Sequence, residues 1–241
     1  MNLLIITGGS NGIGKATAQK YTAENFIVYS ISRSKAANVS YHQLEADLSN
    51  TKEAIKAITS IFSKTELSLL SSITLINNAG SLGEINSLGN IDSEDIQQTI
   101  QLNTTTPIVL SNEFIRLTNH LKCKKQIITI SSGAAINPYV GWSIYCSSKA
   151  AIEMMTKTIA LEQTELQNGV NAFAIKPGVV DTNMQTQIRN TSEKAFKNVQ
   201  RFKELKENNE LYSPEFVANK IYAIDSQDQL KNGDIIDIRK F

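Results

Sequence analysis

Cysteine and histidine are scarce in this sequence, and their scarcity excludes several kinds of site. The 241 residues contain 2 cysteines and 2 histidines. Cys123 and Cys146 are too few for a disulfide framework and lack the spacing of zinc ligands, so we expect reduced thiols. His42 and His120 have no partners at a recognisable spacing, and no cluster of carboxylates, histidines and cysteines indicates a metal. The sequence therefore predicts neither disulfides nor a metal site.

Excess charge and long apolar runs are also missing. Lys and Arg number 24, Asp and Glu number 23, and the net charge is +1. This balance gives no basic surface for nucleic acid or for an anionic membrane. No apolar run reaches the ~18 residues that a transmembrane helix needs. Residues 2–6 enter a strand pattern without a basic leader or a cleavage site. We therefore expect a cytoplasmic protein that acts on a small molecule, without nucleic acid or membrane partners.

The sequence does contain a regular alternation of strand-like and helical patterns. It has no internal repeat and no linker, so one domain over residues 1–241 is expected. The expected strands are residues 3–7, 26–32, 43–48, 73–77, 126–130, 170–175 and 234–238. The expected helices are residues 12–23, 52–62, 93–119 and 142–165, and the polar segment 183–211 is expected to form a helical lid over the substrate. Such alternation predicts an α/β fold, a doubly wound parallel sheet with helices on both faces.

A glycine-rich turn follows the first expected strand and opens the first helix. It reads Gly8-Gly9-Ser10-Asn11-Gly12-Ile13-Gly14, a Gly-x-x-x-Gly-x-Gly spacing rather than the commoner dinucleotide fingerprint. Glycines let a backbone approach a pyrophosphate, and the N-terminus of a helix offers unpaired N–H groups to it. The alternative is a plain strand-to-helix turn. We predict cofactor contacts from Gly8, Ser10, Asn11, Gly12, Ile13 and Gly14.

The end of the second strand bears on the choice of cofactor. Enzymes that prefer the unphosphorylated dinucleotide place a carboxylate here for the ribose hydroxyls, and this chain has none. Arg33 can instead pair with a 2′-phosphate through a charge-assisted fork. The alternative is that Arg33 is a solvated loop residue. The sequence therefore favours NADP(H).

Polar and small residues at three further strand ends extend the expected nucleotide site. The carboxyl ends of parallel strands are where open α/β sheets bind their ligands. At the third strand, Asp47 and Leu48 can offer adenine a hydrogen bond and an apolar contact. We expect further cofactor contacts from Asn78, Ala79, Gly80, Pro177, Gly178, Val180 and Thr182.

Tyr145 and Lys149 lie four residues apart in an expected helix, and so on one helical face. A phenol ionises near pH ~10, and an adjacent ammonium favours its ionised form and lowers its pKa. Such a pair can give and take a proton near neutral pH. Ser132 lies at the carboxyl end of the preceding strand, thirteen residues before Tyr145. The alternative is an ordinary surface pair.

Asn103 falls inside the long expected helix, where an amide side chain is unfavourable unless the helix bends or the side chain has a function. The alternative is an ordinary polar surface position.

These residues together resemble the short-chain dehydrogenase/reductase family over essentially the whole chain. The matching motifs are TGGSNGIG, NNAG, Asn103, Ser132, Tyr145-x-x-x-Lys149 and PGVVDT. The resemblance implies a seven-stranded Rossmann sheet of order 3-2-1-4-5-6-7. It also implies a homodimer or a tetramer built through the long helices after strands four and five. The family's usual gap to the tyrosine implies Ser132, rather than Ser131, as the catalytic serine.

Within the family, four stretches resemble the sepiapterin reductases and the bacterial benzil reductases: SSGAAINPYVGWSIYCSSKAA, ALEQ, PGVVDTNMQTQIR and the tail NGDIIDIRKF. In sepiapterin reductase an aspartate of the matching tail holds the amino end of the pterin, which implies that Asp237 binds substrate. Asn11 departs from the basic residue that many NADP-dependent members carry, which leaves Arg33 as the main phosphate contact.

The resemblance implies NADPH-dependent reduction of a ketone or diketone. Tyr145 would donate the proton, Lys149 would bind the nicotinamide ribose, and Ser132 would hydrogen-bond the substrate carbonyl. Asn103 would hold a water that connects Lys149 to solvent. A pterin side-chain ketone is an alternative substrate. A remoter alternative is a non-catalytic NADP-sensing regulator, and the intact Asn103, Ser132, Tyr145 and Lys149 speak against it.

Overall fold

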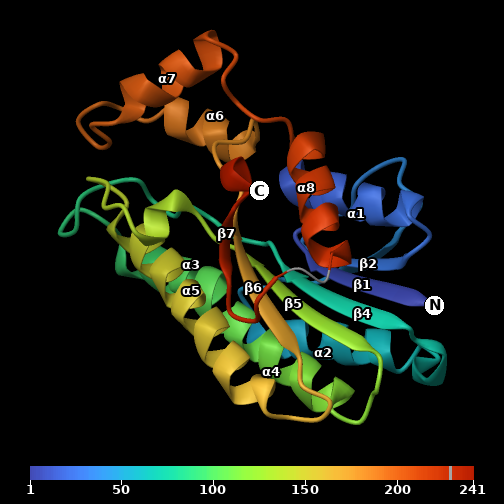
Figure 1. Cartoon of the computed structure of the whole chain (residues 1–241). Coiled ribbons are helices and arrows are strands. Elements are labelled where there is room, and N and C mark those ends of the chain that lie inside the picture. The colour runs from blue at the N-terminus through green and yellow to red at the C-terminus, as the bar shows by residue number, and fades with distance from the viewer. Residues whose placement is uncertain (228–229) are drawn as a thin grey trace.

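The fold is a seven-stranded parallel sheet with helices on both faces (Figure 1). The computed structural model describes residues 1–227 and 230–241. The strands are β1 (Asn2–Thr7), β2 (Ile27–Ser32), β3 (His42–Glu45), β4 (Ser72–Asn77), β5 (Lys124–Ile130), β6 (Asn171–Lys176) and β7 (Ile235–Asp237). Their order is β3-β2-β1-β4-β5-β6-β7, and every neighbouring pair is parallel. The predicted fold class and strand order are therefore confirmed.

Two hydrophobic cores hold the helices against the two faces of the sheet. Successive side chains of a strand point to opposite faces, so Leu3 and Ile5 of β1 enter one core and Leu4 and Ile6 enter the other. The first core packs against α2 (Thr51–Phe62) and α4 (Thr106–Thr118). The second core packs against α1 (Gly12–Ala23) and α8 (Pro214–Ser226), which lie side by side in Figure 1.

Helix α8 was not among the helices expected from the sequence. Its start has a recognisable signal, because the Ser213 hydroxyl caps the helix by accepting a hydrogen bond from the Phe216 N–H at 3.1 Å. Pro214 then occupies the first turn, where a missing N–H costs nothing. Val217, Ile221 and Ile224 are buried at helical spacing. Helix α8 therefore packs beside α1 on the same face of the sheet.

The long helix expected over residues 93–119 is interrupted at its centre. It consists of α3 (Ser93–Ile100), a π-helical turn (Gln101–Thr105) and α4, which continue one another. A π-turn inserts an extra residue into the helix and is frequent at functional sites. The interruption contains Asn103, the residue whose amide was unfavourable in a regular helix.

A small helical cap lies over the carboxyl edge of the sheet, formed by α6 (Asn183–Arg189) and α7 (Val199–Glu207) (Figure 1). Ile188, Phe196, Val199 and Phe202 are buried and pack on the start of α5 (Ser143–Thr164). The residues between α6 and α7 form turns, whereas the whole segment 183–211 was expected to be helical. Within the part of the chain that the structure describes, no helix has the length and apolarity needed to cross a membrane.

Candidate active site

One large cavity, of about 600 Å³, opens at the carboxyl ends of the strands and beneath the cap. Every residue predicted to contact the cofactor lies in its wall. These residues are Gly8, Ser10, Asn11, Gly12, Ile13, Gly14, Arg33, Asp47, Leu48, Asn78, Ala79, Gly80, Tyr145, Lys149, Pro177, Gly178, Val180 and Thr182. Ser132 lies in the same wall, whereas Asn103 and Asp237 lie outside it. The fold thus brings residues from six strand ends to one place.

The glycine turn gives this cavity an end suited to an anion. Gly8 has a φ of +69°, a conformation that side chains disfavour. A Cβ on Gly14 would stand 2.2 Å from the Gly8 carbonyl oxygen, so only glycine lets α1 begin this close to the turn. The N-terminus of α1 has no capping side-chain hydrogen bond and no acidic residue in its first turn. Its backbone N–H groups are therefore available to a pyrophosphate.

The neighbouring wall holds Arg33 and Asp47. The Asp47 carboxylate accepts hydrogen bonds from the Ser49 N–H at 2.9 Å and the Ser49 hydroxyl at 2.8 Å. These bonds, and then the charge of Arg33, hold the pKa of Asp47 below its ordinary value. Arg33 is exposed, and among the described residues no carboxylate lies within ion-pair distance of its guanidinium. Arg33 can therefore receive a phosphate at the adenosine end.

The two adjacent serines at the end of β5 have different partners. The Ser131 hydroxyl donates to Glu153 Oε1 at 2.6 Å, and Glu153 also pairs with Lys176 at 3.2 Å. Ser131 is therefore bound into a buried network beside the site. The Ser132 hydroxyl instead accepts the Ala134 N–H at 3.1 Å and hydrogen-bonds Tyr145. This division supports Ser132 as the serine that faces the reacting group.

Tyr145 and Lys149 are both buried on α5, with 6% and 5% of their surfaces exposed. The Lys149 ammonium donates to the Ile130 carbonyl at 2.8 Å and lies 5.7 Å from the centre of the Tyr145 ring. Burial lowers the pKa of Lys149 to about 8. Burial also raises the pKa of Tyr145 to about 12, and the hydrogen bond from Ser132 opposes this only in part. The surface-pair interpretation is therefore wrong.

The expected lowering of the Tyr145 pKa is also absent. The expectation rested on the charge of Lys149, whereas the loss of solvent around the phenol has the larger effect on its pKa. Tyr145 is therefore a neutral phenol at physiological pH. A neutral phenol is the protonation state that a proton donor requires.

Asn103 is buried behind this pair rather than exposed. Its Oδ1 accepts the Ser81 N–H at 2.8 Å, and its Nδ2 donates to the Ser81 carbonyl at 2.7 Å and to the Ser148 hydroxyl at 3.2 Å. A Cβ on Gly80 would lie 3.3 Å from Asn103 Oδ1 and 3.6 Å from Lys149 Nζ, so the three residues are neighbours. Asn103 thus fixes the loop after β4 against the start of the Tyr145 helix, and it is not a surface residue.

The far end of the cavity has an aromatic wall. The ring of Trp142 lies 5.5 Å from that of Tyr145, 5.0 Å from that of Tyr139 and 4.6 Å from that of Phe196. Phe202 of the cap lies 5.6 Å from Trp142. Tyr139 and Trp142 were not among the expected site residues, although Trp142 stands three residues before Tyr145. This wall suits an apolar, aromatic substrate.

The C-terminal turn places Arg239 in the cavity wall and Asp237 behind it. Strand β7 ends at Asp237, and the chain then turns through a 3₁₀ helix (Ile238–Lys240). Asp237 Oδ1 accepts Arg239 Nε at 2.8 Å, and Oδ2 pairs with Arg239 Nη2 at 2.5 Å. These bonds lower the pKa of Asp237. The structure therefore pairs Asp237 with Arg239, in place of the direct substrate contact that the resemblance implied.

Comparison with known proteins agrees with this geometry. The family model described as short chain dehydrogenase matches residues 2–193. A benzil reductase ((S)-benzoin forming) from Bacillus subtilis is 40% identical over 100% of both chains. A sepiapterin reductase from Xenopus laevis is 26% identical over 98% of this chain and 94% of its own.

The fold has close structural counterparts as well. A crystal structure of a short chain dehydrogenase/reductase from Saccharomyces cerevisiae superposes with a TM-score of 0.85, at 23% identity, covering 99% of this chain and 96% of its own. Family match, full-length relatives and a shared fold lead to one conclusion: the chain belongs to the short-chain dehydrogenase/reductase family of oxidoreductases.

Proposed function

We propose that this protein reduces ketones and diketones with NADPH, and that Tyr145 donates the proton. The observation that carries the proposal is the meeting of Ser132, Tyr145 and Lys149 in the wall of the cavity that the glycine turn opens. When bound, the nicotinamide supplies the hydride that reduces the carbonyl carbon. The residues of the chain supply position, a proton and a water-poor environment.

Tyr145 and Ser132 act on the substrate oxygen. Ser132 can hydrogen-bond the carbonyl and stabilise the negative charge that develops on it. Tyr145 holds its proton firmly in the buried site, because its pKa is about 12. The alkoxide formed during reduction is a stronger base than this phenol, so the proton passes to the product.

Lys149 and Asn103 support this transfer. The Lys149 ammonium is held by the Ile130 carbonyl and lies over one side of the Tyr145 ring, where it stabilises the phenolate left behind. We propose that Lys149 also binds the nicotinamide ribose. Asn103, packed against Gly80 beside Lys149, would position the water that returns a proton from solvent.

Arg33 supports the choice of NADPH over NADH, because it is exposed in the cavity wall and no described carboxylate lies within ion-pair distance of it. Asp47 is held by Ser49 and faces the same region as an acceptor for adenine.

The aromatic wall supports a substrate with an aromatic body, and the Bacillus relatives are named for benzil. The pterin alternative relied on a free Asp237 carboxylate, and that carboxylate is paired with Arg239. A sensing regulator is disfavoured by the complete set of Asn103, Ser132, Tyr145 and Lys149.

One screen separates these possibilities. NADPH oxidation by the purified protein would be followed with benzil, with a pterin ketone and with simple aldehydes. Rapid reduction of benzil is expected. Turnover of the pterin alone would support the alternative substrate, and binding of NADPH without turnover of any carbonyl would support a regulator.

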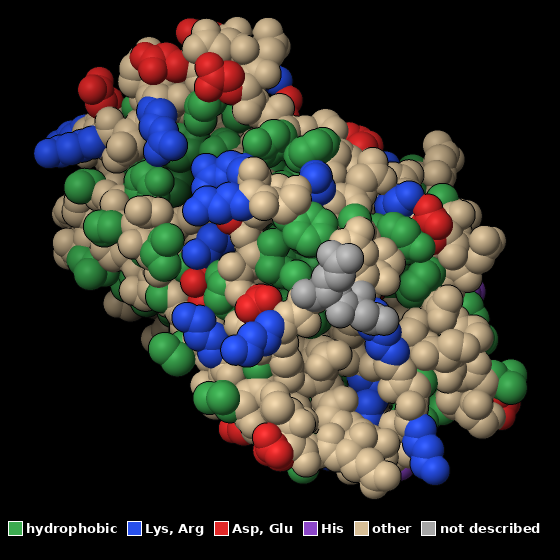
Figure 2. Space-filling model, in the orientation of Figure 1, with side chains coloured by type: hydrophobic (Ala, Val, Ile, Leu, Met, Phe, Trp, Pro, Cys, Tyr) green, Lys and Arg blue, Asp and Glu red, His purple; other side chains and the backbone are tan. Residues whose placement is uncertain are grey.

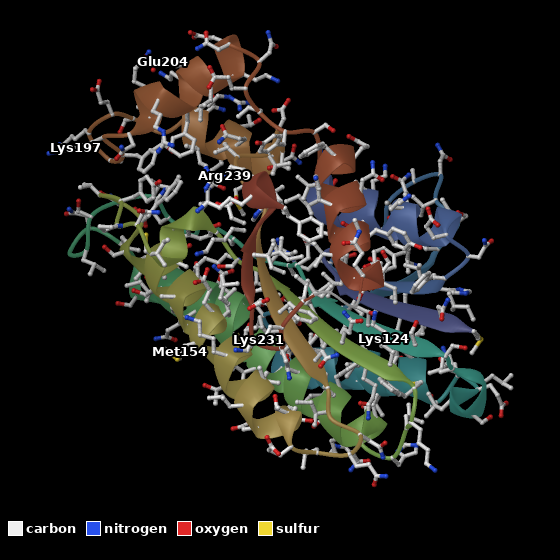
Figure 3. All side chains as sticks on the ribbon, in the orientation of Figure 1. Lys124, Met154, Lys197, Glu204, Lys231 and Arg239 are labelled. Atoms are coloured by element: carbon white, nitrogen blue, oxygen red, sulfur yellow. The ribbon has the colours of Figure 1, made fainter. Side chains whose placement is uncertain are left out.

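We also propose a cytoplasmic homodimer, with a tetramer as the larger option. Apolar side chains are exposed on the outer helices: Ile108 of α4 is 46% exposed, and Met154 and Leu161 of α5 are 63% and 79% exposed. Met154 and Leu161 lie seven residues apart and share one face of α5, on which Figure 3 labels Met154. Light scattering of the wild type and of Leu161→Glu would test this, with a smaller species expected for the variant.

A further inference from the structure

We propose that the substrate carries a carboxylate at the end remote from its reacting carbonyl, and that Arg239 and Arg201 bind this carboxylate. The inference rests on the proposed carbonyl reductase function and adds a substrate class to it. It begins from two guanidinium groups, on segments far apart in the sequence, that lie in the wall of the same cavity as Tyr145.

Asp237 holds Arg239 in a fixed position in the cavity wall. Asp237 binds its Nε and Nη2 atoms, and the remaining N–H groups of the guanidinium fork are left for another acceptor. The Arg239 side chain is 55% exposed although its partner is only 16% exposed. A Cβ on Gly178 would lie 3.8 Å from Arg239 Cδ, which places the arginine over the turn that follows β6. Asp237 therefore acts as a positioning residue.

Arg201 approaches from the cap. Its Nη1 donates to the Tyr139 hydroxyl at 3.4 Å, and its guanidinium lies 5.7 Å from the Phe202 ring. Within residues 1–227 and 230–241, no carboxylate pairs with Arg201 at ion-pair distance. An arginine that lines a cavity with a phenol as its polar contact has donors to spare for an anion.

Tyr139 connects Arg201 with the catalytic residues. Its hydroxyl accepts a hydrogen bond from Arg201 Nη1 at 3.4 Å. Its ring also packs on Trp142, the neighbour of Tyr145. The aromatic wall therefore runs from the proton donor to Arg201, and Arg239 lines the same cavity. Figure 2 shows Lys and Arg side chains gathered below α6 and α7, at the place where Figure 3 labels Arg239.

Near Arg201 and Arg239, the acidic residues of the cavity wall do not neutralise the positive charge of both arginines. Asp237 is paired with Arg239, and Asp95, an acid of the cavity wall, accepts the Glu84 N–H at 2.7 Å. A planar carboxylate matches the guanidinium fork, and the aromatic rings between the fork and Tyr145 match an aryl body. The substrate class that fits is an aromatic ketone with a distal carboxylate.

The test compares benzil-4-carboxylate with its methyl ester, which share a reacting diketone and differ in charge. The wild type is expected to show a kcat/KM for the carboxylate roughly ten- to a hundredfold above that for the ester, the range of a charge-assisted hydrogen bond. Arg201→Gln and Arg239→Gln should each reduce this ratio at least several-fold. Added salt should weaken the preference in the wild type.

Two further variants make the result specific. Arg239→Gln leaves Asp237 unpaired and could repel an anion for that reason, so the double variant Asp237→Asn/Arg239→Gln should lose the preference as well. Arg116→Gln is the matched control, because Arg116 pairs with Glu113 on α4 and lies outside the cavity wall. It should leave the ratio unchanged.

Equal kcat/KM for the two compounds, or a preference that survives both arginine substitutions, would overturn the inference while leaving ketone reduction intact. Reduction of neither compound by a protein that still binds NADPH would instead overturn the proposed function, and the inference with it.

Discussion

The two ends of the cavity are built in different ways. The cofactor end consists mainly of backbone and small residues in turns that directly follow strands, as at Gly8, Gly12 and Gly80. The proposed substrate end consists of large side chains that approach from separate segments: Trp142 from the start of α5, Phe202 from the cap and Arg239 from the C-terminal turn. A binding site made of backbone follows from the fold, whereas one made of side chains can change without altering the fold.

Tyr145 stands where the two ends meet, and its replacement should have the largest effect. Tyr145→Phe removes only the hydroxyl, so turnover of benzil should fall at least about a hundredfold, the usual contribution of a general acid. The Kd for NADPH should stay within about twofold, because no polar contact with the nucleotide phosphates is lost. Tyr222→Phe on α8, outside the cavity wall, is the control and should keep full activity. A Tyr145→Phe variant with more than about a tenth of wild-type turnover would show that another group is the acid.

Lys149 lies beside Tyr145, and its burial can be tested through the pH dependence of the free energy of unfolding. Its pKa in the folded protein is about 8, below the ordinary 10.5, so between these values the unfolded chain binds the extra proton. Stability of the wild type therefore gains a contribution as pH rises through this window. The Lys149→Met variant has no such titrating group. The difference in unfolding free energy between the two proteins should therefore move by about 2 kcal/mol in favour of the wild type between about pH 8 and 9.5. Urea unfolding of both proteins measures this, and a pH-independent difference would contradict the buried ammonium.

Arg33 tests the cofactor end alone. Arg33→Ala should weaken NADPH binding by more than about tenfold, or about 1.4 kcal/mol, and leave NADH binding nearly unchanged. Titration of both cofactors measures the ratio. Lys35→Ala, an exposed cation two residues away and outside the cavity wall, is the matched control. Equal loss for both cofactors would mean that Arg33 supports the loop rather than the phosphate.

The cap tests the substrate end and should give the smallest effect. Helix α7 is amphipathic and joins the protein through Val199, Phe202 and the Lys206–Asp181 ion pair at 2.5 Å. We expect its amide hydrogens to exchange faster than those of β5 in the free protein and to slow when NADPH and substrate are both added. Equal, strong protection of α7 and β5 in the free protein would mean that the cap does not open.

The cofactor end could be predicted from sequence because its signals are local. The spacing of Gly8, Gly12 and Gly14 after an apolar strand marks a turn whatever surrounds it. Tyr145 and Lys149 were likewise linked by helical spacing. The pKa of Tyr145 could not be predicted, because it depends on the side chains of the cap and of Trp142 that exclude water, and these come from other parts of the chain.

The C-terminal tail also depends on structure that the sequence did not reveal. The resemblance of the tail to that of sepiapterin reductase implied that Asp237 contacts the substrate. Because β7 ends at Asp237 and the chain turns, Arg239 points into the cavity and Asp237 supports it from behind. Asn103 could be predicted in part. The sequence showed that its side chain fits a regular helix poorly, and the structure shows that it lies in a π-turn instead.

The most direct test of the central claim is the fate of the hydride when wild-type protein reduces benzil with NADPH in which both hydrogens at C4 of the nicotinamide are replaced by deuterium. If the two ends of the cavity meet at Tyr145, mass spectrometry should find one deuterium on the carbinol carbon of the benzoin for each NADPH oxidised. Oxidation of NADPH without labelled benzoin, or benzoin without deuterium, would contradict carbonyl reduction at this site.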